Sequence, residues 1–330
     1  MTVELAEVLR YKMGRPTGLE PATPRSTILC SNQLSYDRRK KLPNGDFPVG
    51  RKCCQPVSRL CLGGAPPRLL CVPTQRLRLV TFNIAHGRGL TPIQGLTSPR
   101  KLRVNLRRIA DLLGRLGADL VALQEIDECS VWSGSFDHLD YLRAHAHFPH
   151  AAFGINNRRE GLVSLSYGNA ILSRFRINET ETIAFGQRKL GEKGFLFAEI
   201  DVGGRIVPVV NLHLHFSSRR RRLIQIEHLV TWLRGKQRER GRAWTIQPIV
   251  CGDFNNPGTR NDATAALLSH LNDYGDYALH PLMGRTFPSP LPGRALDFVF
   301  IPPGCRSVRS EVVRSFLSDH RPVMVEFSVA

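Results

Sequence analysis

Residues 76–84 read RLRLVTFNI and residues 118–126 read ADLVALQEI, and these two stretches frame the fold. The first alternates and is rich in Leu, Val and Phe, which predicts a strand that ends at Asn83. The second is a short apolar run of the buried-strand type, with Glu125 near its end. Between them an amphipathic helical stripe recurs through Leu102, Leu106, Ile109, Leu113 and Leu116. The sequence therefore predicts a strand, a helix that ends at Gly117 and a second strand.

Both element types continue downstream. We expect a second helix over residues 219–238, with its apolar stripe at Leu223, Ile226, Val230 and Leu233. Strands are expected at residues 168–173, 195–201, 206–216, 248–251, 295–301 and 322–329, the second and third forming a hairpin around Gly203 and Gly204. Because strands dominate and hairpins break strict βαβ alternation, the class is mixed α/β, with sheets packed face to face and helices outside.

The composition limits the classes of protein to consider. The 330 residues include 46 Lys and Arg against 28 Asp and Glu, a net charge of +18, and 42% hydrophobic residues, which excludes global disorder. No apolar run reaches the roughly 18 residues that a membrane-spanning helix needs, and the N-terminus lacks the apolar core of a secretory signal. We therefore expect a cytoplasmic protein. The positive charge favours phosphate-bearing partners, because it attracts and steers anions.

Residues 1–75 differ from the rest of the chain in composition and in hydrophobic periodicity. They hold five of the eight Cys, many Pro and +7 of the net charge (12 Lys and Arg against 5 Asp and Glu). Neither helical nor strand periodicity persists there, and no Cys-x-x-Cys pair with a matching His suggests zinc. We predict a tail without function, either disordered or lying upstream of a true start near Val72, and a catalytic domain over residues 76–330.

Polar side chains interrupt the apolar strands at or near their ends. Such residues are expensive to bury, so each needs a partner or a role, and rigid strand ends are where proteins position catalytic groups. The residues concerned are Asn83, Glu125, His213, Asp253, Asn255, Asp297, Asp319 and His320. Structural alternatives stay open at this point: an exposed position for Glu125, turns at Asn83 and at Asp253 with Asn255, and a buried salt bridge for Asp297.

These residue types suit hydrolysis of a phosphate ester. Carboxylate and amide oxygens without thiolates are ligands for hard cations such as Mg²⁺ or Mn²⁺, which keep several waters and contact a substrate phosphate. Cationic groups stabilise charge on the phosphoryl oxygens while a basic group positions the attacking water. A His beside a carboxylate is held in the tautomer and orientation that proton handling requires.

Seven short motifs carry a family resemblance. They are TFN at 81–83, LQE at 123–125, GNAILSR at 168–174, NLH at 211–213, GDFN at 252–255, LDFVF at 296–300 and SDHRPV at 318–323. In this order they resemble the endonuclease/exonuclease/phosphatase superfamily, which includes pancreatic deoxyribonuclease, abasic-site endonucleases, neutral sphingomyelinases and inositol-polyphosphate 5-phosphatases. The resemblance implies a four-layer αββα sandwich, deoxyribonuclease-I-like, with one active site at an end of the two sheets.

The resemblance also implies where metal and substrate bind. Glu125 resembles the principal ligand of Mg²⁺ or Mn²⁺, with Asn83 beside it as metal and substrate contact. Asp319 matches a position associated with metal binding. Asn255 matches the residue that holds the scissile phosphate during catalysis.

The remaining carried-over residues are catalytic. Asp253 matches the group that aligns or deprotonates the attacking water. His213 matches the group that stabilises the pentacovalent transition state or assists the leaving group. Asp297 and His320 resemble an orienting carboxylate–imidazole pair.

Other residues have weaker interpretations. His213 and His215 are expected on one face of a strand, a spacing that also suits a transition metal, but no Cys or third His lies nearby. His215 stands where the family often has an acidic residue, so we interpret it as structural. Arg219 opens a run of four Arg at a predicted helix N-terminus, where cations oppose the helix dipole, and either solvation or phosphate contact explains the run. Tyr167 is a candidate substrate contact, and Cys251 a core residue.

Three functions are compatible with the sequence. The leading one is a divalent-metal-dependent phosphodiesterase acting on nucleic acid, because counterion release drives the binding of basic proteins to nucleic acid. No aromatic and basic platform for bases is visible, however. The second keeps the chemistry but acts on a phospholipid head group, an inositol phosphate or another small phosphoester. The third is a non-catalytic nucleic-acid-binding protein. No protein partner is indicated, and we expect a monomer.

Overall fold

The computed structural model of the chain describes residues 75–159, 164–186, 192–241, 244–256 and 262–329. The predicted tail, residues 1–75, lies outside the described residues apart from Gln75, so its lack of function stays a prediction. Within the described ranges, no helix combines the length and the hydropathy that crossing a bilayer requires.

The strands form two sheets of six, which we call sheet 1 and sheet 2. The order in sheet 1 is β11 (Cys305–Val312), β12 (Val323–Val329), β1 (Gln75–Asn83), β2 (Leu120–Asp127), β4 (Leu165–Ser173) and β3 (His150–Arg159). The order in sheet 2 is β5 (Arg176–Ala184), β6 (Gly194–Val202), β7 (Arg205–His213), β8 (Ile249–Asp253), β10 (Asp297–Ile301) and β9 (Ala278–His280). Each sheet contains one parallel pair, β1 with β2 and β7 with β8.

One helix connects the strands of each parallel pair, α2 (Pro99–Leu116) between β1 and β2 and α4 (Arg219–Arg240) between β7 and β8. The structure also describes the helices α3 (His138–His145) and α5 (Ala263–Leu271). The Ser98 side chain accepts a hydrogen bond from the Lys101 amide at the start of α2, and Gly117 ends that helix in the left-handed conformation. The Ser218 side chain caps α4 in the same way, through the Arg221 amide.

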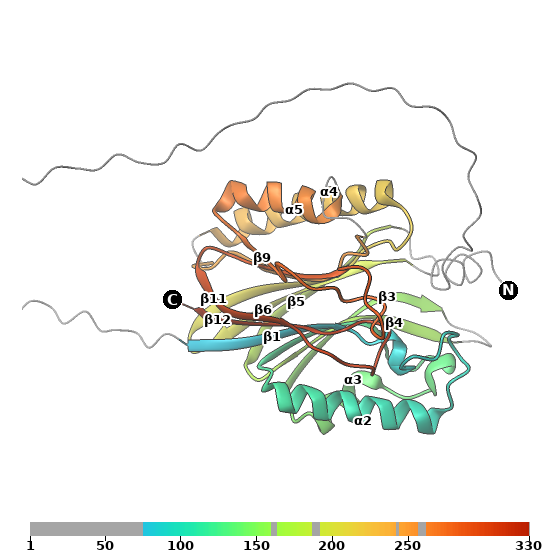
Figure 1. Cartoon of the computed structure of the whole chain (residues 1–330). Coiled ribbons are helices and arrows are strands. Elements are labelled where there is room, and N and C mark those ends of the chain that lie inside the picture. The colour runs from blue at the N-terminus through green and yellow to red at the C-terminus, as the bar shows by residue number, and fades with distance from the viewer. Residues whose placement is uncertain (1–74, 160–163, 187–191, 242–243, 257–261, 330) are drawn as a thin grey trace, which may run out of the picture. The chain divides into compact units, whose positions relative to one another are not determined.

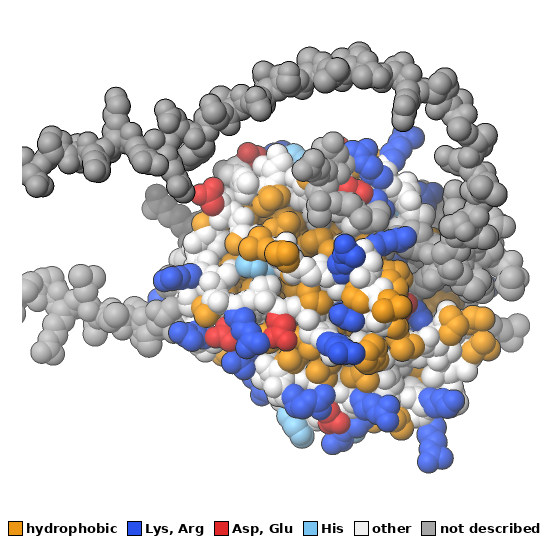
Figure 2. All heavy atoms as spheres, viewed as in Figure 1, with side chains coloured by type: hydrophobic (Ala, Val, Ile, Leu, Met, Phe, Trp, Pro, Cys, Tyr) orange, Lys and Arg blue, Asp and Glu red, His pale blue; other side chains and the backbone are white. Residues whose placement is uncertain are grey.

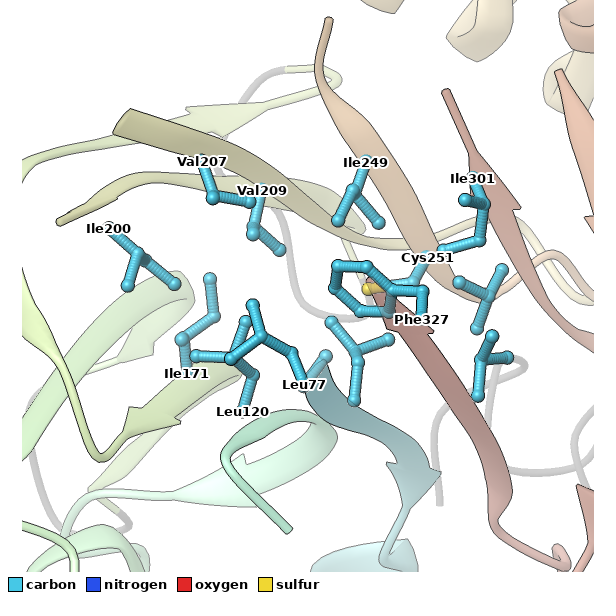
Figure 3. Close-up of a cluster of buried hydrophobic side chains, with 14 of the residues drawn as sticks. Leu77, Leu120, Ile171, Ile200, Val207, Val209, Ile249, Cys251, Ile301 and Phe327 are labelled. Carbon is cyan, nitrogen blue, oxygen red and sulfur yellow. The ribbon is translucent and has the colours of Figure 1, made fainter. Parts of the chain in front are cut away.

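The layers follow from which faces of the sheets are apolar. Figure 1 shows α2 and α3 covering one sheet and α4 and α5 covering the other, with the two sheets packed between them. Side chains of both sheets meet in the central cluster, including Leu77 and Phe327 from sheet 1 and Val209 and Ile249 from sheet 2 (Figure 3). One further cluster lies between each sheet and its helices. The predicted four-layer αββα sandwich is confirmed.

The predicted elements are present, with changed ends. Strand β2 continues to Asp127, and β7 ends at His213 and not at residue 216. Six elements that the sequence analysis missed are the short helices α3 and α5 and the strands β3, β5, β9 and β11. All four missed strands lie at the edges of the two sheets.

Strand register brings the polar strand ends together. In the parallel pair β1 and β2, Asn83 lies opposite Gln124, one residue before Glu125. In the parallel pair β7 and β8, His213 lies opposite Asp253, and Asp253 in turn lies opposite Asp297 of the antiparallel neighbour β10. Because parallel strands end at the same edge of a sheet, these polar residues collect at one end of the sandwich.

Candidate active site

Asp253, the last residue of β8, lies at the centre of the polar cluster. Its Oδ2 atom accepts a hydrogen bond of 2.9 Å from Asn83 Nδ2, which reaches across from sheet 1. The same oxygen lies 3.5 Å from His213 Nε2 and 3.7 Å from His320 Nε2. The side chain of Asp253 is fully buried, and burial raises its pKa to about 6, against the opposing field of the His320 imidazolium. This carboxylate is therefore a stronger base than an exposed Asp.

His320 and Asp297 form a buried imidazole–carboxylate pair. His320 Nδ1 lies 2.9 Å from Asp297 Oδ2, so Asp297 orients the ring and leaves Nε2 directed toward Asp253. Burial alone disfavours the imidazolium, but Asp297 and Asp253 outweigh it and raise the pKa of His320 to about 10. The structure thus brings these two predicted partners together beside Asp253.

Asp253, Asp297 and His320 also present one ligand atom each within 4.8 Å of one another. A metal there requires a neutral His320 with a lone pair on a nitrogen. In the structure Asp297 already bonds His320 Nδ1, and the two neighbouring carboxylates raise the pKa of the imidazole. We therefore interpret this trio as a proton-handling group and look for the metal ligands elsewhere.

Glu125 occupies a bulge inside β2 and not the end of the strand. The register between β2 and β4 shifts between Gln124 and Ile126, and Glu125 has φ of +51°. A bulge of this kind redirects one side chain out of the regular alternation. The Glu125 carboxylate lies 3.7 Å from His86 Nε2 and 3.9 Å from Lys193 Nζ, so two basic groups flank it.

The donors at this position fit a hard divalent cation. Glu125 offers carboxylate oxygens and Asn83 an amide oxygen, which are the ligand types that Mg²⁺ and Mn²⁺ prefer. Asn83 Oδ1 also accepts a hydrogen bond of 3.0 Å from the Ala85 amide, so the turn that the sequence left open is present alongside its contact with Asp253. No thiolate takes part in this group among the described residues.

A second imidazole–carboxylate pair, absent from our prediction, lies beside Glu125. His86 Nδ1 is 2.7 Å from Asp127 Oδ2, and Trp132 Nε1 donates a hydrogen bond of 2.8 Å to the other oxygen of Asp127. Burial works to raise the pKa of Asp127, but His86 lowers it below the ordinary value. Tyr167 packs edge-on against His86, with ring centroids 5.3 Å apart. Tyr167, predicted as a substrate contact, is thus placed at this pair.

Lys193 is a further basic residue that sequence reasoning missed. Its Nζ lies 3.3 Å from His213 Nδ1 and, as noted above, 3.9 Å from Glu125. An ammonium group only donates, so His213 accepts through Nδ1 and in its neutral form carries its proton on Nε2, facing Asp253. Lys193 directly precedes Gly194, which pairs with His213 across β6 and β7, so strand pairing sets its position.

Asn255 and Asp319 lie beside the central cluster with partners of their own. The Asn255 amide donates a hydrogen bond of 2.9 Å to Asp253 Oδ1, an Asx turn, and its Nδ2 donates 3.0 Å to the Leu214 carbonyl. Asp319 Oδ2 forms an ion pair of 2.6 Å with Arg88, which the sequence analysis did not single out. Asp319 is therefore placed beside a permanent cation, and its role as a metal ligand stays a prediction.

The expected position of His215 needs correction. His215 follows the end of β7 and does not share a strand face with His213: its Nδ1 accepts hydrogen bonds from the amides of Ser217 and Ser218, and its Nε2 lies 2.9 Å from a guanidinium nitrogen of Arg221. Burial, together with the positive charge of Arg221, lowers the pKa of His215 to about 4. The imidazole is therefore neutral at pH 7, which agrees with its interpretation as a structural histidine.

The Arg run divides between two roles. Arg222 turns inward, is buried and forms an ion pair of 2.5 Å with Asp262, so it joins α4 to the start of α5. Arg219 is exposed at the first position of α4, and its phosphate contact stays a prediction.

Comparison with known proteins identifies the group to which this geometry belongs. The profile of the Endonuclease/Exonuclease/phosphatase family matches residues 80–320. The chain belongs to this family. Most members are hydrolases that act on phosphoesters, and the family generally uses divalent metals. No curated protein matches the chain.

Solved structures of the endonuclease/exonuclease/phosphatase family share the fold at low identity. A family protein from Beutenbergia cavernae is 18% identical with a TM-score of 0.59, over 77% of this chain and 72% of that one. A mannosyl-6-phosphatase from Bacteroides thetaiotaomicron is 18% identical with a TM-score of 0.55, over 76% and 99%. Sphingomyelinase C from Streptomyces griseocarneus is 21% identical with a TM-score of 0.53, over 78% and 100%. At these identities the likeness concerns the fold alone.

Proposed function

We propose that the protein is a divalent-metal-dependent phosphodiesterase. The observation that carries the proposal is the convergence on Asp253 of three side chains from separate strands and loops. Asn83 bonds to it from sheet 1, and His213 and His320 lie 3.5 and 3.7 Å from it. Hydrolysis of a phosphate ester needs a base for the attacking water and groups that stabilise negative charge. Asp253 can act as the base, and the oriented imidazole and a cation on the nearby oxygen ligands can stabilise the charge.

The proposed roles follow from the contacts. Asp253 Oδ2, held by Asn83, accepts the proton of the attacking water, and its pKa near 6 suits a base at neutral pH. His320, oriented by Asp297, supplies positive charge or a proton to the phosphoryl oxygens. His213, with Nε2–H directed at the same region, donates to the phosphoryl or leaving-group oxygen. Asn255, beside Asp253, contacts the phosphate.

Glu125 and Asn83 would hold the metal, with Asp319 as the further predicted ligand. Bound there, Mg²⁺ or Mn²⁺ would neutralise charge on the substrate phosphate. His86 and Lys193 flank the Glu125 carboxylate at 3.7 and 3.9 Å and hold it in place. These two residues therefore act on the ligand and not on the substrate directly.

Two substrate classes have support from different observations. The net charge of +18 favours nucleic acid, through counterion release. Exposed apolar side chains on loops beside the site favour a phospholipid. The phosphodiester chemistry is the same for both, so one assay separates them.

Hydrolysis should be measured with Mg²⁺ or Mn²⁺ on plasmid DNA, abasic duplex, RNA, sphingomyelin, inositol phosphates and bis-p-nitrophenyl phosphate. We expect Asp253→Ala and His320→Ala each to lower the rate by at least about 10²-fold, the scale of removing one positioned catalytic group. Asp273→Ala and His228→Ala, which change exposed residues of the same types, should leave the rate unchanged.

Each outcome has a separate meaning. If the wild type hydrolyses none of these substrates with metal supplied, the proposed phosphodiesterase function is contradicted and the non-catalytic nucleic-acid-binding alternative is favoured. Hydrolysis of lipids alone would exclude the nuclease, and hydrolysis of nucleic acids alone would exclude the lipid substrate.

A further inference from the structure

Three large apolar side chains are exposed on loops beside the candidate active site. Leu90 is 45% exposed, Phe316 48% and Leu291 85%, and we call these three residues the apolar rim. The connection between β9 and β10, which carries Leu291, also exposes Leu282 and Met283 almost fully. Exposed apolar groups gathered in one place mark a binding surface more often than scattered ones do.

The three rim residues belong to loops that meet at Ser318, two residues before His320. Gly89, the neighbour of Leu90, forms a β-bridge with Ser318. Phe316 lies two residues before Ser318 in the chain. Ser289, two residues before Leu291, donates its amide to the Asp319 carbonyl and its hydroxyl to the Ser318 carbonyl, both at 2.7 Å. The three loops that carry the rim residues therefore meet beside His320.

The loop that carries Leu291 is held rigidly. Backbone hydrogen bonds join Thr286 and Phe287 to Arg294 and close the loop at its base. The Phe287 ring packs 4.9 Å from the ring of His320, and Thr286 Oγ1 accepts hydrogen bonds from the amides of Leu296 and Asp297. Leu291 is thus presented outward on a loop fastened to the catalytic pair, and it does not fold back to cover itself.

Cations accompany the rim. Arg285 and Arg294 are exposed on the loop that carries Leu291, and the Arg314 guanidinium lies 5.6 Å from the Phe316 ring centre. Figure 2 shows hydrophobic patches interleaved with Lys and Arg, and few acidic side chains, on the face that it presents. Apolar side chains together with cations are complementary to a surface that offers both hydrocarbon and negative charge.

We propose that the apolar rim docks the protein on an anionic phospholipid bilayer, so that a lipid phosphodiester enters the site. The three side chains insert at the boundary between head groups and acyl chains, while the Arg side chains contact lipid phosphates. Cations carry most contacts to a nucleic-acid backbone and aromatic side chains stack on its bases, so the exposed Leu side chains favour the lipid surface. The lipid substrate rests on the proposed phosphodiesterase function, whereas the docking itself does not.

Docking is tested with the full chain and large unilamellar vesicles. The rim variant Leu90→Ser/Leu291→Ser/Phe316→Ser is compared with Val104→Ser/Ile224→Ser/Val308→Ser, which removes three exposed apolar side chains (47%, 53% and 49%) from α2, α4 and β11. Co-sedimentation is measured with vesicles of phosphatidylglycerol and phosphatidylcholine, and with phosphatidylcholine alone. Hydrolysis of soluble bis-p-nitrophenyl phosphate is measured in parallel.

We expect the wild type to bind the anionic vesicles and to bind less in high salt. The rim variant should bind at least about tenfold more weakly, because three insertable side chains are gone, and the control should bind like the wild type. Both should keep the thermal midpoint and the rate on the soluble diester. No vesicle binding by the wild type, equal loss in both variants, or rim-dependent binding of plasmid DNA instead would overturn the proposal. Vesicle binding with no diester hydrolysis would instead reject the proposed enzyme function.

Discussion

The backbone conformation of Glu125 determines where its carboxylate lies in the candidate site. Its bulge, with φ of +51°, turns the carboxylate toward His86 and Lys193 and away from the regular alternation of β2. A non-glycine residue in this region of backbone conformation is strained and is kept only where the surroundings enforce it. The strain is consistent with a residue selected for the position of its carboxylate.

Glu125→Gln should weaken metal binding without unfolding the protein. The substitution keeps the shape but removes the negative charge that attracts a divalent cation, so the apparent Mg²⁺ or Mn²⁺ affinity should fall by at least about tenfold. Isothermal titration of the metal into the protein measures it directly, and Glu239→Gln on the exposed face of α4 is the matched control. An unchanged affinity would show that the metal binds elsewhere, with the Asp253, Asp297 and His320 trio as the next candidate.

The residues found from the sequence share a local signal that the missed ones lack. Asp253 and Asp297 stand within apolar runs, where a charge is conspicuous, and the structure brings both to one place. His86, Arg88 and Lys193 lie in polar loop sequence, where a basic residue is ordinary. Only strand pairing and loop packing show that they face Glu125, Asp319 and His213, so no pattern in the chain alone distinguishes them.

Among the secondary-structure elements, the inner strands were predicted from the sequence and the edge strands were not. The eight inner strands of the two sheets were all expected, because neighbours on both sides and layers on both faces demand nearly continuous apolar residues. The four edge strands were all missed: β5, for example, exposes alternate residues, and both β5 and β11 carry Arg and Glu. Edge strands keep polar residues to limit pairing with other chains, so their sequences resemble loops.

Gly252 is essential to the pairing of β7 with β8. It has φ of +140°, and a Cβ atom there would lie 1.9 Å from the Leu212 carbonyl oxygen. Gly252→Ala should push β8 away from β7, separate Asp253 from His213 and lower the free energy of unfolding by about 2–4 kcal/mol. Chemical denaturation together with the diester assay measures both effects.

Gly204→Ala is the matched control for Gly252→Ala. Gly204 also has positive φ, at +87°, but a Cβ there meets nothing within 4 Å. It should show only the conformational effect, about 1 kcal/mol. Equal destabilisation by the two variants would mean that backbone conformation, and not the close approach to Leu212, explains Gly252.

At the scale of the whole molecule, a buried polar network joins the two sheets. Gln124 Nε2 donates to Thr81 Oγ1 and to Asn211 Oδ1, at 3.0 and 2.7 Å. Asn211 Nδ2 donates to the carbonyls of Leu123 and Ala170, at 2.9 and 2.8 Å. Asn211 belongs to sheet 2 and the other four residues to sheet 1, so these bonds fix how the two halves of the site face each other.

Asn211→Leu should destabilise the fold by about 2–4 kcal/mol, because it leaves buried polar groups without partners. It should also lower activity, since Asn83 and Glu125 on one sheet must stay aligned with Asp253 on the other. Urea unfolding checks the first effect and the diester assay the second. Asn178→Leu, at an exposed position of β5, is the control, and equal stability of the two variants would contradict a structural role for the network.

The order of strands also constrains how the chain is made. Residues 176–301 build the whole of sheet 2, nested between the two parts of the chain that build sheet 1. During synthesis on the ribosome, all strands of sheet 2 are available before sheet 1 is complete. Strand β1 stays unpaired on one side until β12 emerges, because Gln75 near the start of the domain pairs with Val329 near its end. During that interval the unpaired side of β1 is the natural point for chaperone binding or for aggregation. Asp319 and His320 are the last candidate site residues to emerge, so the site cannot be complete until sheet 1 can close.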